Sequence, residues 1–228
     1  MKRFIAIVLL VTVLCGTLAV QANNDSTASA KEVLAELNII DENYFSNSNV
    51  ITREECLIAV MRVIGLTDED VEKLNGADLI SFADTGAFTY FGCADLSGIA
   101  YGEECIVDYP TERTRHTLKN TDFFFFPNRV VTVEETLAFM VRCLGGNNDE
   151  DIQNIVEKAK EYALINSEDT FIKDVGSAIS QDDFYILLDR LLHQRRYKYY
   201  ERLNDGFRMD GNIDEERSMT YLEFLTQR

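Results

Sequence analysis

The chain has 228 residues, of which 46% are hydrophobic, and this content excludes a disordered chain while allowing one large domain or several small repeats. Its 39 acidic and 22 basic residues give a formal net charge of −17. Nucleic acids and anionic membrane surfaces would repel such a chain, so we expect neither as a partner, and a solvated acidic surface is enough to explain the charge.

The first residues have the organisation of a secretory signal peptide. A positive pair, Lys2 and Arg3, precedes a largely apolar run over 4–14, and residues 20–22 have the small-x-small pattern of a signal-peptidase site. We therefore expect residues 1–22 to be removed on export. After this cleavage we expect no membrane contact, because no other stretch is long and apolar enough to cross a bilayer.

Two alternatives to a cleaved signal are less favoured. An uncleaved membrane anchor needs about 20 apolar residues, more than this run supplies. A lipoprotein would be attached at Cys15, but Leu14 precedes this cysteine where a lipobox has a small residue. Beyond the signal, we expect residues 23–29 to be a linker.

Four cysteines remain after cleavage, namely Cys56, Cys93, Cys105 and Cys143. An even number in an exported protein permits disulfides. However, Cys56 and Cys143 lie within apolar helical patterns, where a free cysteine behaves as a small buried hydrophobe. There is no C-x-x-C pair, so neither a zinc site nor a redox motif is indicated. We favour buried free thiols.

Three stretches of the chain repeat one pattern. Each has an apolar residue, then a hydroxyl residue suited to a helix N-cap, and an acidic residue three positions after the cap. The caps are Thr52, Thr132 and Ser180, and the corresponding acids are Glu55, Glu135 and Asp183. The first two pairs predict full capping boxes, and the third predicts a weaker one because Asp is shorter. Each cap opens an amphipathic helical pattern.

Further positions agree among these three helices. Arg62, Arg142 and Arg190 share one register, and we expect them to share a structural role, such as hydrogen bonding to carbonyl groups of the connectors. Gly65 and Gly145 are candidates for the helix C-termini. Agreement over this length indicates an internal repeat.

A shorter helical stretch precedes each capped helix, at 33–40, 93–100 and 159–166. The connector after the middle one is longer than the other two and contains a polar insertion near 103–122, which we expect to be a hairpin or an excursion loop. Insertions in repeat proteins often contribute to a binding face, but a tolerated surface loop is an equal alternative.

These repeats resemble those of the S-layer homology family. The first carries Ile51-Thr52-Arg53-Glu54-Glu55, which is similar to the family's opening of the longer helix. The middle one carries Phe82-Ala83-Asp84, Gly98-Ile99, Gly102 and Phe126-Pro127-Asn128, which are similar to the family's repeat start, short-helix end and connector. The resemblance places Phe126, from the FFFF run at 123–126, in the core.

The resemblance covers residues 30–195 and implies a mainly α fold. It implies three helix-loop-helix repeats packed as a pseudo-threefold helical bundle. A small β-hairpin is one of the two forms that we expect for the insertion, independently of the resemblance. The expected boundaries are 30–78, 79–147 and 148–195, followed by a C-terminal tail over 196–228.

The resemblance also implies a function. Members of this family tether exported bacterial proteins to the cell wall, so we expect a non-catalytic protein secreted to the cell wall or cell surface. Its expected partner is an anionic secondary cell-wall polymer or a peptidoglycan-associated glycan, bound without a cofactor or metal. The polymer-binding residues implied are Thr52, Arg53, Glu54, Gly98 and Gly102. The guanidinium of Arg53 and free amides at the helix N-terminus would hold a carboxylate.

The chain departs from the family at several positions. Val133 and Gln181 stand where the motif has arginine, and there is no Trp. The alternative function is therefore a protein–protein interaction module, binding another envelope protein, on a similar scaffold that has lost carbohydrate binding. For Arg53, an exposed residue in the first helical turn is the alternative to a ligand contact.

Nothing in the sequence favours an enzyme. His116 and His193 are the only histidines, and no glycine-rich phosphate loop or nucleophile elbow is present. Residues 210–221 are similar to a calcium loop but lack its glycine and closing glutamate. In the tail, we expect 194–203 to continue the third helix as a basic, aromatic partner surface, and 219–225 to be a strand or a short helix.

Overall fold

The computed structural model describes residues 27–40, 50–74, 82–85, 89–110, 117–146, 149–203, 206–210 and 219–228. About half of the residues that the structure describes are helical, and the described strands form two small antiparallel sheets, which agrees with the mainly α fold expected. The expected signal peptide lies outside the described residues. Of the expected linker, residues 27–29 belong to the first helix, which spans 27–36.

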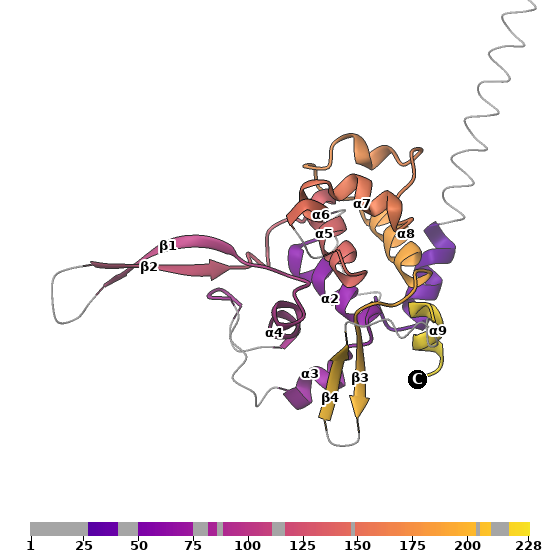
Figure 1. Ribbon diagram of the computed structural model, residues 1–228, viewed down its shortest axis with the longest axis horizontal. Helices are drawn as coiled ribbons and strands as arrows, with labels where there is room; N and C mark the ends of the chain where they lie inside the picture. The colour runs from indigo at the N-terminus through magenta and orange to yellow at the C-terminus, as the bar shows by residue number, and fades with distance from the viewer. Residues whose placement is uncertain are drawn as a thin grey trace, which may run out of the picture.

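Three long helices begin at the predicted caps (Figure 1). They are α2 (Arg53–Val63), α5 (Val133–Cys143) and α8 (Gln181–Leu192). The two full capping boxes are confirmed at Thr52 and Thr132. At Ser180 the hydroxyl accepts from the Asp183 amide at 3.2 Å and donates to the Asp183 carboxylate at 2.6 Å.

The three shorter helices, over 27–36, α4 (Thr89–Leu96) and α7 (Ile155–Glu161), end in one conformation. The second residue after each helix has a left-handed backbone conformation. These residues are Asn38 with φ 55°, Gly98 with φ 63° and Ala163 with φ 53°. The next residue is fully buried, and its amide donates to a carbonyl five positions earlier. These residues are Ile39, Ile99 and Leu164, with N–O distances of 2.9, 2.8 and 2.9 Å.

The shared role expected for the three arginines is confirmed. Nη1 of Arg62, Arg142 and Arg190 donates to the carbonyl of Ile39, Ile99 and Leu164, at 3.2, 3.2 and 3.0 Å. Each arginine thus ties a long helix to the end of the short helix before it. A buried carbonyl that the short helix leaves unpaired is satisfied in this way.

The segments that enter the long helices pair with one another. Bridges join Val50 to Ser180, Thr52 to Val130, and Thr132 to Ala178. In addition, the Val131 amide donates to the Ile51 carbonyl at 2.9 Å, and the Ile179 amide donates to the Val131 carbonyl at 3.3 Å. The three side chains at the centre, Ile51, Val131 and Ile179, are at most 1% exposed.

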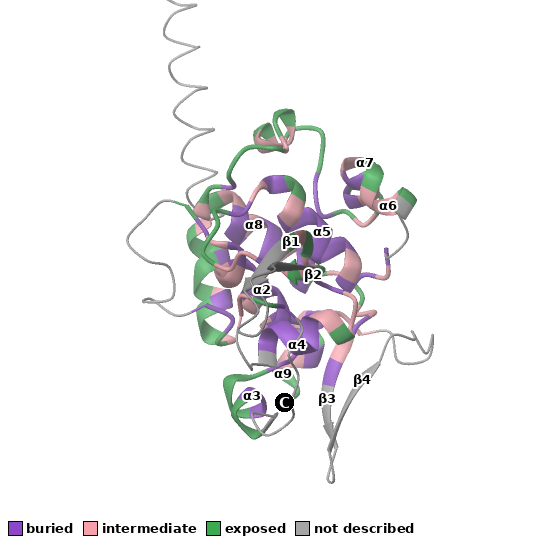
Figure 2. Ribbon diagram, turned by 90° about the vertical axis from the view of Figure 1, so that its left-hand side faces the viewer, coloured by how far each residue is buried: buried purple, intermediate pink, exposed green. Residues whose placement is uncertain are grey.

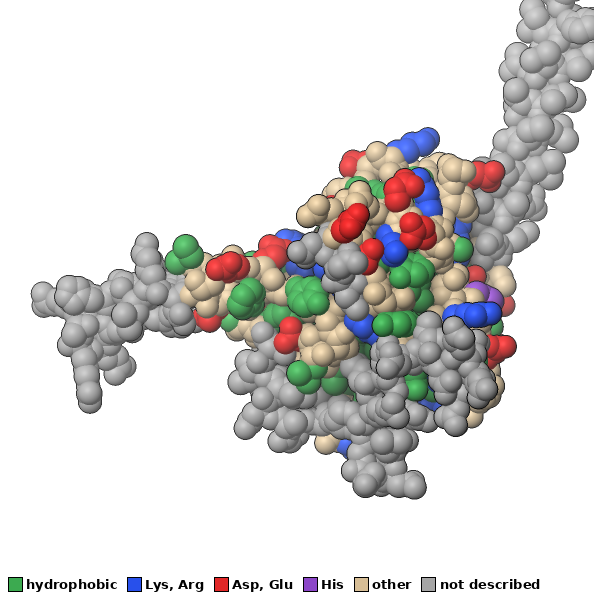
Figure 3. Space-filling view, in the orientation of Figure 1, with side chains coloured by type: hydrophobic (Ala, Val, Ile, Leu, Met, Phe, Trp, Pro, Cys, Tyr) green, Lys and Arg blue, Asp and Glu red, His purple; other side chains and the backbone are tan. Residues whose placement is uncertain are grey.

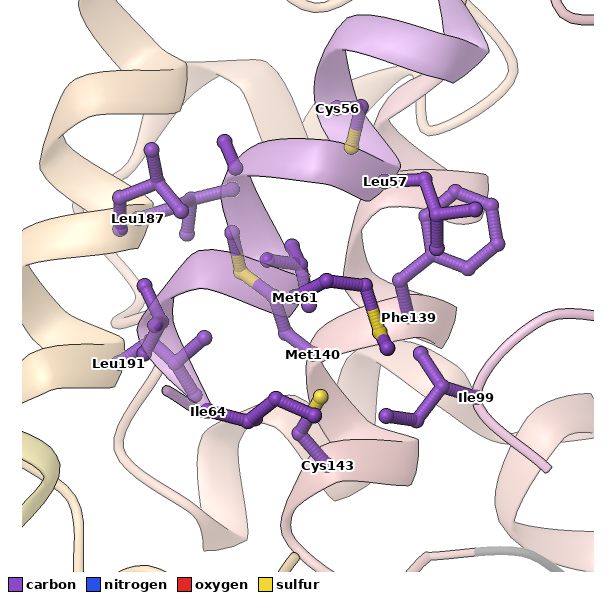
Figure 4. Packing of buried hydrophobic residues seen from close by; sticks show 14 of the residues in the cluster. Cys56, Leu57, Met61, Ile64, Ile99, Phe139, Met140, Cys143, Leu187 and Leu191 are labelled. Atoms are coloured by element: carbon purple, nitrogen blue, oxygen red, sulfur yellow. The ribbon is translucent and has the colours of Figure 1, made fainter. Parts of the chain in front are cut away.

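Helix α2 lies at the centre of the core. It packs against α4, α5 and α8, and buried residues gather where α2, α5 and α8 meet (Figure 2). Leu57 and Met61 of α2 and its C-cap residue Ile64 face residues from α5, α8 and the end of α4 (Figure 4). These neighbours are Phe139, Met140, Leu187, Leu191 and Ile99. A helix surrounded on most sides carries apolar residues on most of its faces, as α2 does.

The insertion forms a β-hairpin, which is one of the two alternatives expected for it. Strand β1 (Glu103–Pro110) pairs with β2 (Thr117–Phe124), and the hairpin projects from the helical body (Figure 1). Hydrophobic side chains are exposed along its described part (Figure 3). Ile106 is 75% exposed and Phe123 is 53% exposed.

The tail does not continue the third helix, so that prediction is wrong. Helix α8 ends at Leu192, and the chain turns into β3 (Tyr199–Leu203), which pairs with β4 (Gly206–Asp210). The cause is tertiary hydrogen bonding. The Lys198 amide donates to the Cys143 carbonyl at 3.0 Å, and the Tyr200 amide donates to the Ile64 carbonyl at 2.6 Å, so the tail satisfies the ends of α2 and α5.

For residues 219–225 a strand and a short helix were the two alternatives, and the structure has a short helix, α9 (Tyr221–Thr226), which packs on α8. Tyr221 is fully buried, and its hydroxyl donates to the Lys198 carbonyl at 2.7 Å. The Arg196 guanidinium lies 4.0 Å from the centre of the Tyr199 ring and 4.7 Å from that of Phe224. This part of the basic, aromatic surface therefore covers an edge of the core.

The remaining elements are short. They are α3 (Asp68–Leu74), α6 (Asp149–Gln153) and a 3-10 helix (Thr170–Lys173). None of the helices in the described ranges is long and apolar enough to cross a bilayer.

The four cysteines expected in the exported chain are free thiols. Cys56 and Cys143 are fully buried, and burial raises the pKa of each to about 12. Burial also raises the pKa of Cys93 to about 11. Cys105, on β1, is partly exposed.

The left-handed positions give a paired test of the short-helix ends. Gly98→Ala should lower the free energy of unfolding by about 1 kcal/mol, because alanine pays for the left-handed conformation that glycine adopts freely. Ala163→Gly should raise it by up to about 1 kcal/mol, because Ala163 is exposed and its methyl loses little packing. Urea denaturation measures both. Changes of the same sign in the two variants would contradict this account.

The cysteines give a second test. In the chain without residues 1–22, iodoacetamide should alkylate Cys105 rapidly under native conditions and leave the three buried cysteines unmodified, since thiolates are the reactive form. Mass spectrometry after native and denaturing labelling measures this. Native alkylation of Cys56 or Cys143 at a rate close to that of Cys105 would show that the core is open.

Candidate functional site

Arg53, the central residue of the expected polymer site, is buried at the start of α2. Its side chain is 5% exposed, and the guanidinium carbon lies 4.5 Å from the centre of the Phe125 ring and 5.9 Å from that of Phe139. The alternative, an exposed residue in the first turn, is therefore wrong. A guanidinium stacked on aromatic rings is held in one orientation.

Two carboxylates neutralise Arg53. Its Nη1 lies 3.1 Å from Oε1 of Glu103, and its Nε lies 3.6 Å from Oε1 of Glu135. Arg129 pairs with the same two carboxylates. The four side chains thus carry two positive and two negative charges. Burial lowers the pKa of the Arg53 guanidinium, and the carboxylates of Glu135 and Glu103 oppose that shift.

One polar atom in this cluster is not satisfied. Nε of Arg53 is buried and makes no hydrogen bond to any residue that the structure describes. A buried donor without an acceptor is costly, so the cluster is not an optimised ion-pair network. Glu103 lies on the hairpin, unlike the other three residues of the cluster. Its side chain is 48% exposed, so it is the more accessible of the two carboxylates.

The backbone amides at the start of α2 are not free, contrary to the expectation. The Arg53 amide donates to the Arg129 carbonyl at 2.8 Å, and the Glu54 amide donates to the Pro127 carbonyl at 3.1 Å. Since the connector before α5 occupies these donors, they are not available to a ligand in this conformation. The start of α5 is occupied in the same way, by the carbonyls of Ser177 and Val175.

The other residues of the expected site divide into two places. Thr52 and Glu54 flank Arg53, and the Thr52 hydroxyl is used as a cap, while burial raises the pKa of Glu54. Gly102 precedes β1, where a Cβ would lie 2.8 Å from side-chain carbons of Phe123 and Phe82. Gly98 instead lies beside Tyr101 and Lys198.

The aromatic run before α5 packs differently from the expectation. Phe125, rather than Phe126, is fully buried, whereas Phe126 is half-buried and stacks on Phe124. The Asp84 carboxylate accepts from the amides of Phe125 and Phe126, at 2.8 and 2.7 Å. This pair of hydrogen bonds turns Phe125 inward beneath Arg53.

Sequence reasoning missed Glu103, Arg129 and Phe125 as members of the cluster. Glu103 begins the polar insertion, and Arg129 lies in the connector three residues before the α5 cap. Neither position repeats elsewhere in the chain, so the internal repeat carried no signal for them.

In comparisons with known proteins, the chain matches no family model, no curated protein and no solved structure. Among the described residues, no group of three or more His, Cys, Asp or Glu side chains is arranged to hold a metal ion.

Because Arg53 is buried and Glu103 is half exposed, substitutions at these two residues should lower the free energy of unfolding by different amounts. Arg53→Ala should lower the free energy of unfolding by about 3 kcal/mol, because it removes the stacked guanidinium and leaves Glu135 without it. Glu103→Gln should cost less than about 1 kcal/mol, since its carboxylate is half exposed. Lys160→Ala, which removes a surface pair with Glu157, is the control. Urea denaturation showing no more destabilisation by Arg53→Ala than by Lys160→Ala would refute a structural role for Arg53.

Proposed function

We propose that the chain is an exported, non-catalytic binding protein of the bacterial cell envelope, built from three S-layer-homology-like repeats in a pseudo-threefold bundle. The recurrence of capped long helices, left-handed short-helix ends and arginine–carbonyl bonds supports three equivalent units. The pairing of the three entry segments supports their closed arrangement. The proposed location is the cell wall or cell surface.

The proposed ligand is an anionic secondary cell-wall polymer or a peptidoglycan-associated glycan, bound at the first repeat. The observation that carries this proposal is that Arg53 and Arg129 share one partly exposed carboxylate, Glu103, at the base of the hairpin. A polymer carboxylate that displaced Glu103 would meet two guanidinium groups in a fixed orientation, with Thr52 and Glu54 on the same helix turn. In this proposal, Glu103 competes with the ligand.

A second candidate is a protein–protein interaction module. The observation that favours it is a pair of exposed apolar side chains on one face of the hairpin, near its base. Ile106 and Phe123 lie on one face of the two-stranded ribbon, because Phe123 is opposite Glu104, the residue two positions before Ile106. Both are more than half exposed, and a two-stranded hairpin is marginally stable without a packing partner.

The polymer proposal is tested by co-sedimentation of the folded protein with wall sacculi, with and without their secondary polymer. The wild-type protein should pellet only with polymer present, and Glu103→Gln should pellet several-fold better because it frees both arginines for the ligand. Glu104→Gln is the matched control, since it removes an equally charged neighbour that faces the other side of β1. If the wild-type protein and Glu103→Gln each pellet to the same extent with and without the secondary polymer, polymer binding at this site is rejected.

The same preparation distinguishes the second candidate. If the protein binds another envelope protein through the hairpin, the double variant Ile106→Ser, Phe123→Ser should lose that partner in a pull-down from solubilised envelopes. Leu96→Ser, a change at an exposed leucine of α4, is the control. Equal recovery of the partner by all three proteins would exclude the hairpin face as the contact.

A further inference from the structure

The equivalent arginines Arg62, Arg142 and Arg190 differ in one respect: Arg62 and Arg190 each pair with a carboxylate of the chain. Nη2 of Arg62 donates to both oxygens of Asp68, at 2.9 Å each. Nη1 and Nη2 of Arg190 donate to the two oxygens of Asp169, at 2.6 and 2.9 Å. Each of these guanidinium groups therefore binds one connector carbonyl and one carboxylate.

Arg142 binds its connector carbonyl but has no such carboxylate. Within the described residues, its contacts are the Ile99 carbonyl and the Tyr101 ring, whose centre lies 4.6 Å from the guanidinium carbon. Its Nε is buried and makes no hydrogen bond to the described chain. Arg142 therefore has no described carboxylate in the role that Asp68 has at Arg62 and Asp169 has at Arg190.

A second cation is held close to Arg142. The tail places Lys198 so that its Nζ donates to the Ser97 carbonyl at 2.6 Å, and its side chain is 7% exposed. A Cβ built on Gly98 would lie 3.8 Å from this Nζ and 2.9 Å from the Tyr101 hydroxyl, so the lysine and the tyrosine meet at Gly98. The positive charge of Arg142 helps to lower the pKa of Lys198, after the effect of burial.

The buried Nε of Arg142 is unfavourable while it makes no hydrogen bond, and an acceptor at the guanidinium would relieve this. The chain has 39 acidic residues, and it supplies a carboxylate to Arg62 and Arg190, yet none of the described carboxylates reaches Arg142. Tyr101, whose ring lies against the Arg142 guanidinium, is 48% exposed, so solvent borders the place on the side of this ring. An anion from solution can therefore reach it.

We propose that Arg142, Lys198 and Tyr101 form a binding site for a carboxylate group of a ligand. The ligand carboxylate takes the position at Arg142 that Asp68 takes at Arg62 and Asp169 takes at Arg190. A guanidinium fork matches the two oxygens of a carboxylate, and the ammonium and the phenol hydroxyl add two further donors. The site shares no residue with the cluster around Arg53, so it stands or falls independently of polymer binding there.

The test uses acetate as the probe, titrated into the folded protein at constant ionic strength with chloride as the balancing anion. Backbone amide chemical shifts of Gly98, Ile99 and Tyr101 should change along a saturable curve. Arg142→Gln should abolish the saturable change, and Lys198→Gln should weaken the apparent affinity about tenfold. Arg196→Gln, which removes a tail arginine lying over Tyr199 and Phe224, should bind acetate as the wild type does.

Tyr101→Glu is a second variant that keeps Arg142, so it tests the site even if the Arg142→Gln protein does not fold. It places a carboxylate beside Arg142, so it should raise the melting temperature and remove the response to acetate. A linear, non-saturating response in the wild type would overturn the proposal. So would a response in Lys198→Gln and Tyr101→Glu equal to that of the wild type.

Discussion

Three short extended segments, over 50–52, 130–132 and 178–180, hold the described helices together by pairing with one another. The N-cap residue in each has extended backbone, with φ and ψ of −81° and 161° at Thr52, −87° and 164° at Thr132, and −76° and 157° at Ser180. A capping residue must be extended because its side chain turns back to the helix amides. The same conformation exposes its backbone for pairing, so one local requirement both starts each helix and joins it to the next.

This pairing determines where a ligand can bind. The connector that enters one helix covers the first amides of the preceding one, so helix N-termini that resemble anion sites in sequence are already occupied at Arg53 and Val133. Anionic ligands must then be bound by side chains. The chain neutralises Arg53, Arg62 and Arg190 with its own carboxylates. Binding depends on displacing such a carboxylate, as at Glu103, or on an arginine that lacks one, as at Arg142.

The features predicted correctly from the sequence are those that are local or repeated. The caps at Thr52 and Thr132 follow from residues three apart, and the arginine–carbonyl bonds follow from one register that occurs three times. The environment of Arg53 was not predictable, because its partner Glu103 is 50 residues away and has no counterpart in the other repeats. The helical prediction for 194–203 failed for a similar reason: amides of Lys198 and Tyr200 bond to the ends of α5 and α2, and these distant acceptors outweigh local helix propensity.

The most direct test of the central claim is native-state hydrogen exchange at the junctions between the entry segments. The amides of Arg53 and Val131 report on the junction between the first two segments, and those of Val133 and Ile179 report on the next. If the segments form one closed arrangement, all four amides should exchange only through global unfolding, with opening free energies equal to within about 1 kcal/mol. Much faster exchange at Val133 and Ile179 than at Arg53 and Val131 would show that the third segment opens alone, and would contradict the account.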